Sequence, residues 1–375
     1  MPTLERDLDL LLREAQAARL PSVSAAVVRR GEQVWAGAVG FADAEEGREA
    51  TPETQYRIGS ITKTFTAAAI VLLGAEGKLD LDDPLERHVP EVAHRSLALR
   101  RLLAHSSGLQ REPPGAVWET LEFPDAAELL TRLESAEQVL PTASHFHYSN
   151  LAYALLGEVV ARVSGMPFTR FVDERLIGPV GLGRTTWEPV APVARGYYVD
   201  PHARTLRPEP DFAGDGVAAV GSLWSTPIDL CRWAGYLASV EALHQVQIMD
   251  DPESWTLGHG LGLQLVRKGE RVFFGHGGAM PGFLAMLLGR RKEGIGAAVV
   301  TNATTPPAGV ETIGLRLAEQ AVELWADEAD VWRPEADPPP EVAELLGSWW
   351  IEGTEFVFWW EGGRLRALPS CPASS

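Results

Sequence analysis

Cysteine is nearly absent from this sequence: among 375 residues there are two, Cys231 and Cys371. Two cysteines so far apart cannot supply the several disulfides that stabilise small secreted domains, and they lack the spacing of a metal site. We therefore expect no disulfide framework, no metal ion and no other cofactor.

Long apolar segments are also missing. The longest apolar run falls short of the ~20 residues that a membrane-spanning helix needs, and the charged residues 1–7 contain no apolar core of a secretory signal. These absences predict a soluble, cytoplasmic protein that does not act at a membrane, unless a leader was removed from the chain.

Positive charge is scarce, with 33 Lys and Arg against 51 Asp and Glu, a formal net charge of -18 and a pI near 5.0. This balance argues against a nucleic-acid partner and against an anionic membrane surface, because both attract basic proteins. The acidity by itself indicates only solubility. A small molecule or a short peptide is the expected partner, and the oligomeric state stays open.

The chain is long enough for a large core and two lobes. Amphipathic or capped patterns predict helices, and period-two patterns predict strands. The expected helices are 4–18, the stretch after Ser60, 97–109 with a Ser-Gly turn closing it, 125–133, 151–163, 226–239 and 311–325. The expected strands are 22–30, 33–40, 261–266, 271–275, 282–288 and 295–301, and the segment 188–215 is expected to be loop.

These elements predict an α+β fold in which both ends of the chain build one antiparallel sheet flanked by helices, with an all-helical lobe inserted. The sheet lobe is expected at about 1–80 and 225–335, and the helical lobe at about 81–224. Residues 336–375 follow a Pro-rich linker and predict a short β-rich extension, which needs support from another surface because two or three strands alone are marginal.

Ser60 and Lys63 are the first candidates for chemistry. Three residues apart on a helix, they lie on one face, so the amine can reach the hydroxyl. A serine hydroxyl becomes a strong nucleophile when a neighbouring base takes its proton. The mostly apolar stretch 64–73 places Lys63 at the mouth of a buried helix, where burial favours the neutral amine. The alternative is an N-capping serine beside a solvated lysine.

Two further stretches join them. Tyr148-Ser149-Asn150 stands just before a predicted helix, where the tyrosine could equally cap a backbone group. The segment 273–282 places His276 among glycines in a strand pattern, which would let a substrate or another backbone approach closely. A glycine-rich turn with an exposed histidine is the alternative for that segment.

Together these motifs resemble the serine β-lactamase-like hydrolases related to class C β-lactamases, which include D-Ala-D-Ala carboxypeptidases, D-aminopeptidases and esterases. The resemblance covers residues 5 to 330. It is carried by the nucleophile motif 56–65, the Leu-Leu-Ala-His-Ser-Ser-Gly-Leu signature 102–109, Tyr148-Ser149-Asn150 and His276-Gly277-Gly278. The tail resembles the start of the lipocalin-like C-terminal domain that some members carry.

The resemblance implies a β-lactamase/transpeptidase-like fold and a role for each motif residue. Ser60 would be the acylated nucleophile, and Lys63 and Tyr148 would share the proton transfers. Asn150 would orient Lys63 and the substrate amide. His276 would lie beside Tyr148, and the backbone N–H groups of Ser60 and Ala279 would form the oxyanion hole. Gly277 and Gly278 would complete the substrate-binding strand.

The third motif departs from the family pattern, because His276 replaces a lysine and Gly277 replaces a hydroxyl residue. A lysine and a hydroxyl would help to hold a substrate carboxylate. An esterase or a D-aminopeptidase-like enzyme is therefore favoured over a β-lactamase. The alternatives are a catalytically weak penicillin-binding or sensor protein of the same fold, and an acyltransferase.

Overall fold

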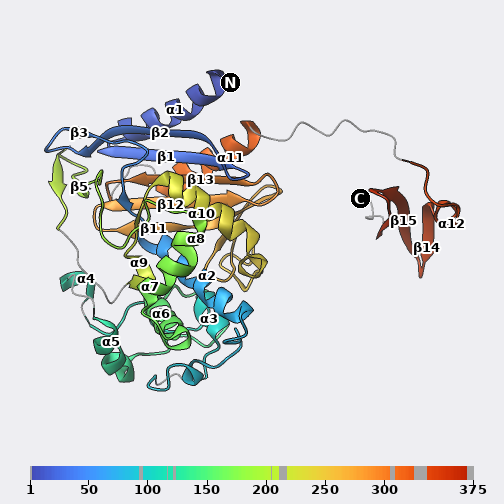
Figure 1. Cartoon of the computed structure of the whole chain (residues 1–375), viewed down its shortest axis with the longest axis horizontal. Helices are drawn as coiled ribbons and strands as arrows, with labels where there is room; N and C mark the ends of the chain where they lie inside the picture. The colour runs from blue at the N-terminus through green and yellow to red at the C-terminus, as the bar shows by residue number, and fades with distance from the viewer. Residues whose placement is uncertain are drawn as a thin grey trace. The chain divides into compact units, whose positions relative to one another are not determined.

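The computed structural model describes residues 2–92, 96–115, 117–120, 124–203, 205–210, 218–304, 309–324 and 336–369. The chain divides into two compact units, residues 1–326 and 327–375. Figure 1 shows the large unit as a broad sheet with helices on its faces and a mainly helical region next to it.

Within the described residues, one nine-stranded antiparallel sheet runs in the order β3-β2-β1-β13-β12-β11-β10-β9-β8. Its strands are β1 (Ser22–Arg29), β2 (Glu32–Asp43), β3 (Arg48–Glu49), β8 (Ile248–Met249), β9 (Leu257–His259), β10 (Gln264–Lys268), β11 (Arg271–Met280), β12 (Phe283–Arg290) and β13 (Ile295–Thr301). The first strand pairs with the last, from Val23 opposite Thr301 to Arg29 opposite Ile295. The predicted sheet built from both ends of the chain is confirmed.

The described helices are α1 (Pro2–Ala17), α2 (Thr62–Ala75), α3 (Leu99–Leu103), α4 (Val117–Thr120), α5 (Ala126–Arg132), α6 (Asn150–Ser164), α7 (Phe168–Val172), α8 (Gly178–Val180), α9 (Ala218–Gly221), α10 (Pro227–Ser239) and α11 (Val310–Leu324). Shorter turns are η1 (Gly59–Ile61), η2 (Leu85–Arg87), η3 (Leu133–Ser135), η4 (Asp173–Ile177) and η6 (Glu241–His244).

Both faces of the sheet are covered, which explains why β1 and β13 are mostly apolar and buried along almost their whole length. Val23, Ala25 and Val27 of β1 pack in the layer formed by α1 and α11. The alternate residues Ala26 and Val28 belong to the opposite core, where α10 lies on the sheet. The second core continues into α2 and α6, so it connects the sheet to the helical region.

Several helix ends follow local sequence signals. Asp125 accepts a hydrogen bond from the Glu128 N–H while the Glu128 side chain accepts from Asp125, which forms the capping box of α5. Thr226 caps α10 by accepting from the Asp229 N–H, with Pro227 at the first helical position.

The expectation of a loop at 188–215 is wrong in part, because a short hairpin pairs β5 (Tyr197–Val199) with β6 (Leu206–Pro208). Tertiary contacts fix it: the Tyr197 N–H donates to the Asn302 carbonyl, and its hydroxyl donates to Asp43. These partners are distant in the sequence, so local patterning did not reveal the strands. Residues 204 and 211–215 of the segment lie outside the described residues.

The strand predicted at 261–266 begins only at Gln264. Gly262 takes a left-handed conformation with φ of +75°, and a Cβ there would lie 2.4 Å from the Cβ of Ala67. The chain therefore turns at Gly262 against helix α2 before it enters the sheet. A further short pair joins β4 (Tyr56–Arg57) to β7 (Trp224–Ser225) beside the turn η1.

The second unit contains α12 (Pro340–Ala343) and an antiparallel sheet of β14 (Gly347–Ile351), β15 (Thr354–Glu361) and β16 (Arg364–Pro369). Trp349 and Trp350 of β14 are exposed, at 45% and 70%. The likeness of this extension to the start of a lipocalin-like domain stays a prediction, as do the predicted boundary at 335 and the predicted lobe limits.

Within the described ranges, no single helix is both long and apolar enough to cross a bilayer; α6 and the bent segment 168–180 reach that length and composition only when taken together, with an angle of 76° between them.

Candidate active site

Ser60 lies in η1, a single turn of 3₁₀-helix that leads directly into α2. Gly59, which precedes it, takes φ of +49°, and a Cβ there would lie 2.6 Å from the backbone nitrogen of Ala279. Only glycine permits this approach. The turn that carries Ser60 is therefore pressed against the strand whose Ala279 N–H is the predicted partner in an oxyanion hole.

Lys63 is fully buried in the first turn of α2. Its Nζ lies 2.9 Å from Ser60 Oγ and donates a hydrogen bond of 2.9 Å to the carbonyl of Val220. Burial lowers the pKa of Lys63 well below its ordinary value of 10.5. In its neutral form, which burial favours, the amine keeps one N–H for Val220 and presents its lone pair to the Ser60 hydroxyl.

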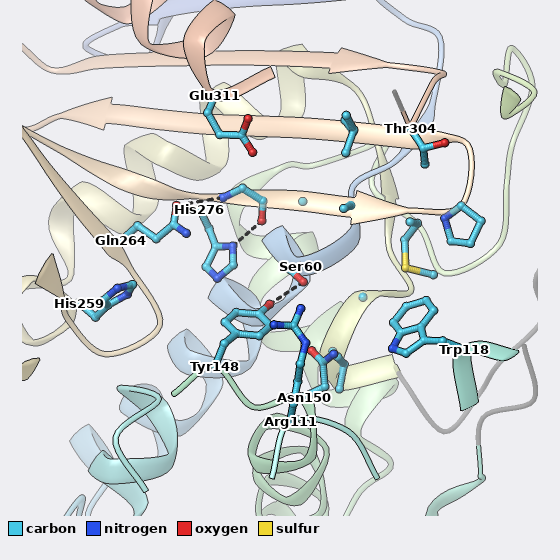
Figure 2. A pocket seen from close by; sticks show the side chains of 18 of the residues that line it. Ser60, Arg111, Trp118, Tyr148, Asn150, His259, Gln264, His276, Thr304 and Glu311 are labelled. Atoms are coloured by element: carbon cyan, nitrogen blue, oxygen red, sulfur yellow. Dashed lines mark hydrogen bonds between the residues drawn. The ribbon is translucent and has the colours of Figure 1, made fainter. Parts of the chain in front are cut away.

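Tyr148 reaches Ser60 from the segment before α6. Its hydroxyl donates to Ser60 Oγ at 2.7 Å (Figure 2). The ring is positioned from behind by His105, which stacks on it at 4.3 Å between centroids and accepts the Ser149 N–H on Nδ1. Burial raises the pKa of Tyr148 above its ordinary value of 10, so the phenol is neutral at physiological pH.

Strand β11 forms the other wall with His276, Gly277, Gly278 and Ala279. A Cβ on Gly278 would lie 1.9 Å from the Ile58 carbonyl oxygen, so glycine is required for the strand to pass this close to the nucleophile turn. The His276 ring lies 6.3 Å from that of Tyr148 and hydrogen-bonds the Gly277 carbonyl through Nδ1 (Figure 2). Burial lowers the pKa of His276 to about 3, so this motif carries no positive charge at neutral pH.

The family of the chain follows from comparison with known proteins. The family model described as Beta-lactamase matches residues 8–321. The chain belongs to the beta-lactamase family.

Curated relatives of this beta-lactamase-family chain carry different activities in their names. The esterase EstB of Burkholderia gladioli is 36% identical over 197 residues, covering 48% of this chain and 49% of the relative. The D-alanyl-D-alanine-carboxypeptidase/endopeptidase AmpH of Escherichia coli is 31% identical over 217 residues, covering 53% of this chain and 54% of the relative. The chain thus spans about half the length of the curated relatives it matches.

Solved structures show the same fold along most of the chain. A D-stereospecific amidohydrolase from Streptomyces matches with a TM-score of 0.73 and 26% identity, over 84% of this chain and 98% of the other. A D-amino acid amidase from Ochrobactrum anthropi matches with a TM-score of 0.75 and 24% identity, over 86% of this chain and 99% of the other. The predicted β-lactamase-like fold is confirmed.

Asn150 behaves differently from what the resemblance implied. Its Nδ2 donates to both carboxylate oxygens of Glu112, at 2.8 and 2.9 Å, and its Oδ1 is buried without a hydrogen-bond partner among the described residues. The hydrogen bonds of Lys63 go to Ser60 and Val220. In this structure Asn150 therefore does not hold Lys63 directly.

Ser60, Tyr148, Asn150 and the β11 residues line one cavity of about 800 Å³. Figure 2 shows Ser60 and Tyr148 at its centre, with His259 and Trp118 toward opposite ends. Four charged side chains also line it: Arg111, Glu209, Asp250 and Glu311. Within the described residues, no group of three or more His, Cys, Asp or Glu side chains could hold a metal ion.

Four contributors to the site were missed from the sequence. Arg111 lies 5.1 Å from the Tyr148 ring centroid, Glu112 holds Asn150, and Gln264 accepts from the Gly277 N–H. Arg111 and Glu112 follow the signature 102–109 closely. Two charged residues directly after a predicted turn could have been recognised as candidate site residues. Val220 acts through its backbone carbonyl, for which the side-chain sequence gives no signal.

Proposed function

We propose that this chain is a serine hydrolase that cleaves an ester or amide through an acyl-enzyme on Ser60. One observation carries the proposal: Ser60 Oγ lies within hydrogen-bond distance of both a buried amine, Lys63, and a half-buried phenol, Tyr148. A nucleophile that touches two proton-transfer groups at the wall of a cavity has the geometry that acyl transfer requires.

The chemistry has two steps. Ser60 Oγ bonds to the substrate carbonyl carbon while its proton passes to the Lys63–Tyr148 pair. The pair then returns a proton to the leaving oxygen or nitrogen as the bond from it to carbon breaks. Water repeats the sequence on the acyl-enzyme and releases the acid. Because the amine and the phenol share the proton, we assign the base role to the pair.

The remaining motif residues are proposed to bind substrate. The backbone N–H groups of Ser60 and Ala279 would receive the developing oxyanion, usually the largest contribution to acyl transfer. Gly277 and Gly278 would let the substrate lie along β11, and His276 would border Tyr148 without adding charge. Asn150 would contact the group attached to the scissile carbonyl.

The proposed substrates are small esters, or amides and short peptides of the D-aminopeptidase type, in preference to β-lactams. The neutral His276 supports this choice, since a carboxylate-bearing substrate would find no cation in the third motif. The names of an esterase and a D-stereospecific amidohydrolase among the similar proteins also support it. The predicted cytoplasmic location and the oligomeric state stay untested.

Intact-mass analysis with a fluorophosphonate probe, and then with a panel of esters, amino-acid amides and β-lactams, tests the proposal. We expect a covalent adduct on the wild type and none on Ser60→Ala. An adduct of equal yield on Ser60→Ala would contradict the assignment of the nucleophile. An adduct on wild type that forms from substrate and never hydrolyses would favour the sensor alternative, and transfer to an added alcohol or amine would favour the acyltransferase.

A further inference from the structure

We propose that a second cavity, beside strands β8 to β11, binds a free medium-chain carboxylate with its apolar tail inside and its charged head at the rim. This cavity has a volume of about 420 Å³, and among the described residues it shares no lining residue with the cavity at Ser60. The proposal concerns a separate site and does not depend on the proposed hydrolase activity.

Strands β9 and β10 lie between the two cavities. Successive residues of a strand point to opposite faces of a sheet. In β9, His259 lines the cavity at Ser60 and Gly258 lines the second cavity; in β10, Gln264 and Leu265 divide in the same way. Figure 2 shows His259 and Gln264 on the side of Ser60. A ligand in the second cavity is therefore separated from Ser60 by this part of the sheet.

The second cavity offers apolar surface that is open to water. Phe274 and Leu265 are almost fully buried, at 2% and 7% exposed, whereas Trp255, Val246 and Val272 are 61%, 57% and 44% exposed. The volume falls in the range of about 300–1,000 Å³ that is usual for small-molecule sites. An apolar tail that covers these exposed side chains gains hydrophobic free energy. The apolar side chains of the lining are Val246, Met249, Trp255, Leu265, Val272 and Phe274.

Positive charge gathers at the same cavity, although the chain as a whole carries a formal net charge of -18. Arg267, Arg291 and Lys292 line it, and no Asp or Glu among the described residues does. These three cations have no carboxylate partner within the described part of the chain, whereas the lining residue Arg290 is paired with Glu293 at 2.8 Å. The charge therefore complements an anion, and a guanidinium matches the planar shape of a carboxylate.

Trp255 has a backbone conformation that its own packing does not explain. Its φ of +56° lies in the left-handed region, which bulky residues rarely adopt. Asp251 holds the loop in this shape: its carbonyl accepts the Trp255 N–H at 2.9 Å, and its carboxylate accepts the N–H groups of Thr256 and Leu257. Such strain persists where the surroundings impose it, commonly at ligand sites. Here it holds an exposed indole ring at the cavity, where an apolar tail can pack on it.

Equilibrium dialysis of the full chain with octanoate tests the proposal, near neutral pH and at low ionic strength. Octanamide has the same tail without the charge, and acetate has the charge without the tail. Wild type should bind octanoate at least about threefold more tightly than octanamide, since each exposed ion pair contributes modestly. Acetate should show no binding over the same concentration range.

The double variant Arg291→Gln, Lys292→Gln should weaken octanoate binding by about threefold or more and leave octanamide binding unchanged. The matched control is Arg6→Gln, Arg13→Gln, which removes two equal charges from the exposed side of α1. That control should leave the affinity for octanoate at the wild-type value.

Trp255→Gly separates a binding role from a structural one. Glycine adopts the left-handed conformation without strain, so the melting temperature should not fall below that of wild type. Octanoate and octanamide should both bind severalfold more weakly, because the variant removes part of the surface that covers the tail. A lower melting temperature with unchanged affinity would show that the ring only packs against the protein, and would contradict the proposal.

Equal binding of octanoate and octanamide by wild type would overturn the proposal, as would an unchanged affinity in the folded Arg291→Gln, Lys292→Gln protein. Cosedimentation with phosphatidylglycerol vesicles, without binding of free octanoate, would assign this surface to a lipid bilayer and would also overturn it. Each of these outcomes leaves the proposed hydrolase untouched, because that function is tested by adducts on Ser60.

Discussion

Ser60, Lys63 and Tyr148 bring three polar groups together at the wall of the cavity, with Lys63 fully buried and the other two half-buried. Burial disfavours the charged form of each titratable group, so the lysine pKa falls and the tyrosine pKa rises. Burial thereby favours the neutral amine and the neutral phenol. That state combines a base with a proton donor at one serine oxygen, which is the requirement of the proposed mechanism.

The pH dependence of kcat/KM follows from this state. The neutral amine is populated above the Lys63 pKa, so activity should rise with pH through that pKa and should not fall near neutrality. The charge of Glu112 raises the Lys63 pKa and that of Arg111 lowers it. Glu112→Gln should therefore move the acidic limb to lower pH, and Arg111→Gln should move it to higher pH.

The measurement is the midpoint of the acidic limb for an uncharged short-chain ester, in wild type and in both variants, at low ionic strength. A change in substrate binding alters the height of the pH profile but leaves the midpoint of its acidic limb in place. The midpoint therefore reports the pKa even if a variant binds the ester less well. Shifts of both midpoints in the same direction would contradict Lys63 as the group that titrates.

At the scale of single residues, the sequence predicted the site residues that lie close together in the chain at a helical spacing. Ser60 and Lys63 are one helical turn apart, so their proximity could be read directly. Tyr148 required the family resemblance, because 88 residues separate it from Ser60. Glu112 was not predicted, since its role depends on where the chain places Asn150, and the orientation of an amide is set by three-dimensional contacts.

At the scale of elements, the site depends on close contact between the turn η1 and the strand β11. Gly59 and Gly278 are the positions where the two backbones meet, and neither has room for a side chain. The two glycines of the third motif, Gly277 and Gly278, therefore differ in how much room a side chain would have. Gly277, one residue earlier, has only the sulfur of Met286 at 3.6 Å from its Cβ position, an ordinary contact.

These neighbouring glycines provide a matched pair. Gly278→Ala should destabilise the protein by about 1–3 kcal/mol through overpacking and should lower kcat, because the Cβ forces β11 away from Ile58. Gly277→Ala should change the free energy of unfolding by less than about 1 kcal/mol. Urea unfolding of both variants, with ester hydrolysis of Gly278→Ala, checks the pair; equal destabilisation would contradict the contact geometry.

Elements with local signals were predicted, and elements made by distant contacts were not. The caps at Asp125 and Thr226 and the alternation of the C-terminal strands were sufficient to place α5, α10, β12 and β13 to within a few residues. The β5–β6 hairpin has strands of three residues, and it is held through Tyr197 by Asn302 and Asp43. A sequence window around Tyr197 contains neither partner.

At the scale of the whole molecule, the sheet requires both ends of the large unit. β1 pairs with β13, and α1 packs against α11 over the same face. Ser22 and Asn302 reinforce this closure, because the Ser22 N–H and hydroxyl both donate to Asn302 Oδ1, at 2.8 and 2.7 Å. The inserted residues between β3 and β8 are therefore folded into a framework that the chain completes only at α11.

This closure predicts the effect of removing the second unit. A chain that ends at residue 326 keeps β1–β13, α11 and every residue of the proposed site, so it should fold and retain kcat/KM for a short-chain ester within about threefold of the full chain, a change below 1 kcal/mol. A chain that ends at residue 309 loses α11, whose Ile313, Leu317 and Ala321 are buried, and it should fail to fold. Circular dichroism melts and ester hydrolysis of the two truncations provide the comparison. If the chain that ends at 326 melts like the full chain but has lost its activity, the second unit contributes to the site and the assignment of catalysis to residues 1–326 is wrong.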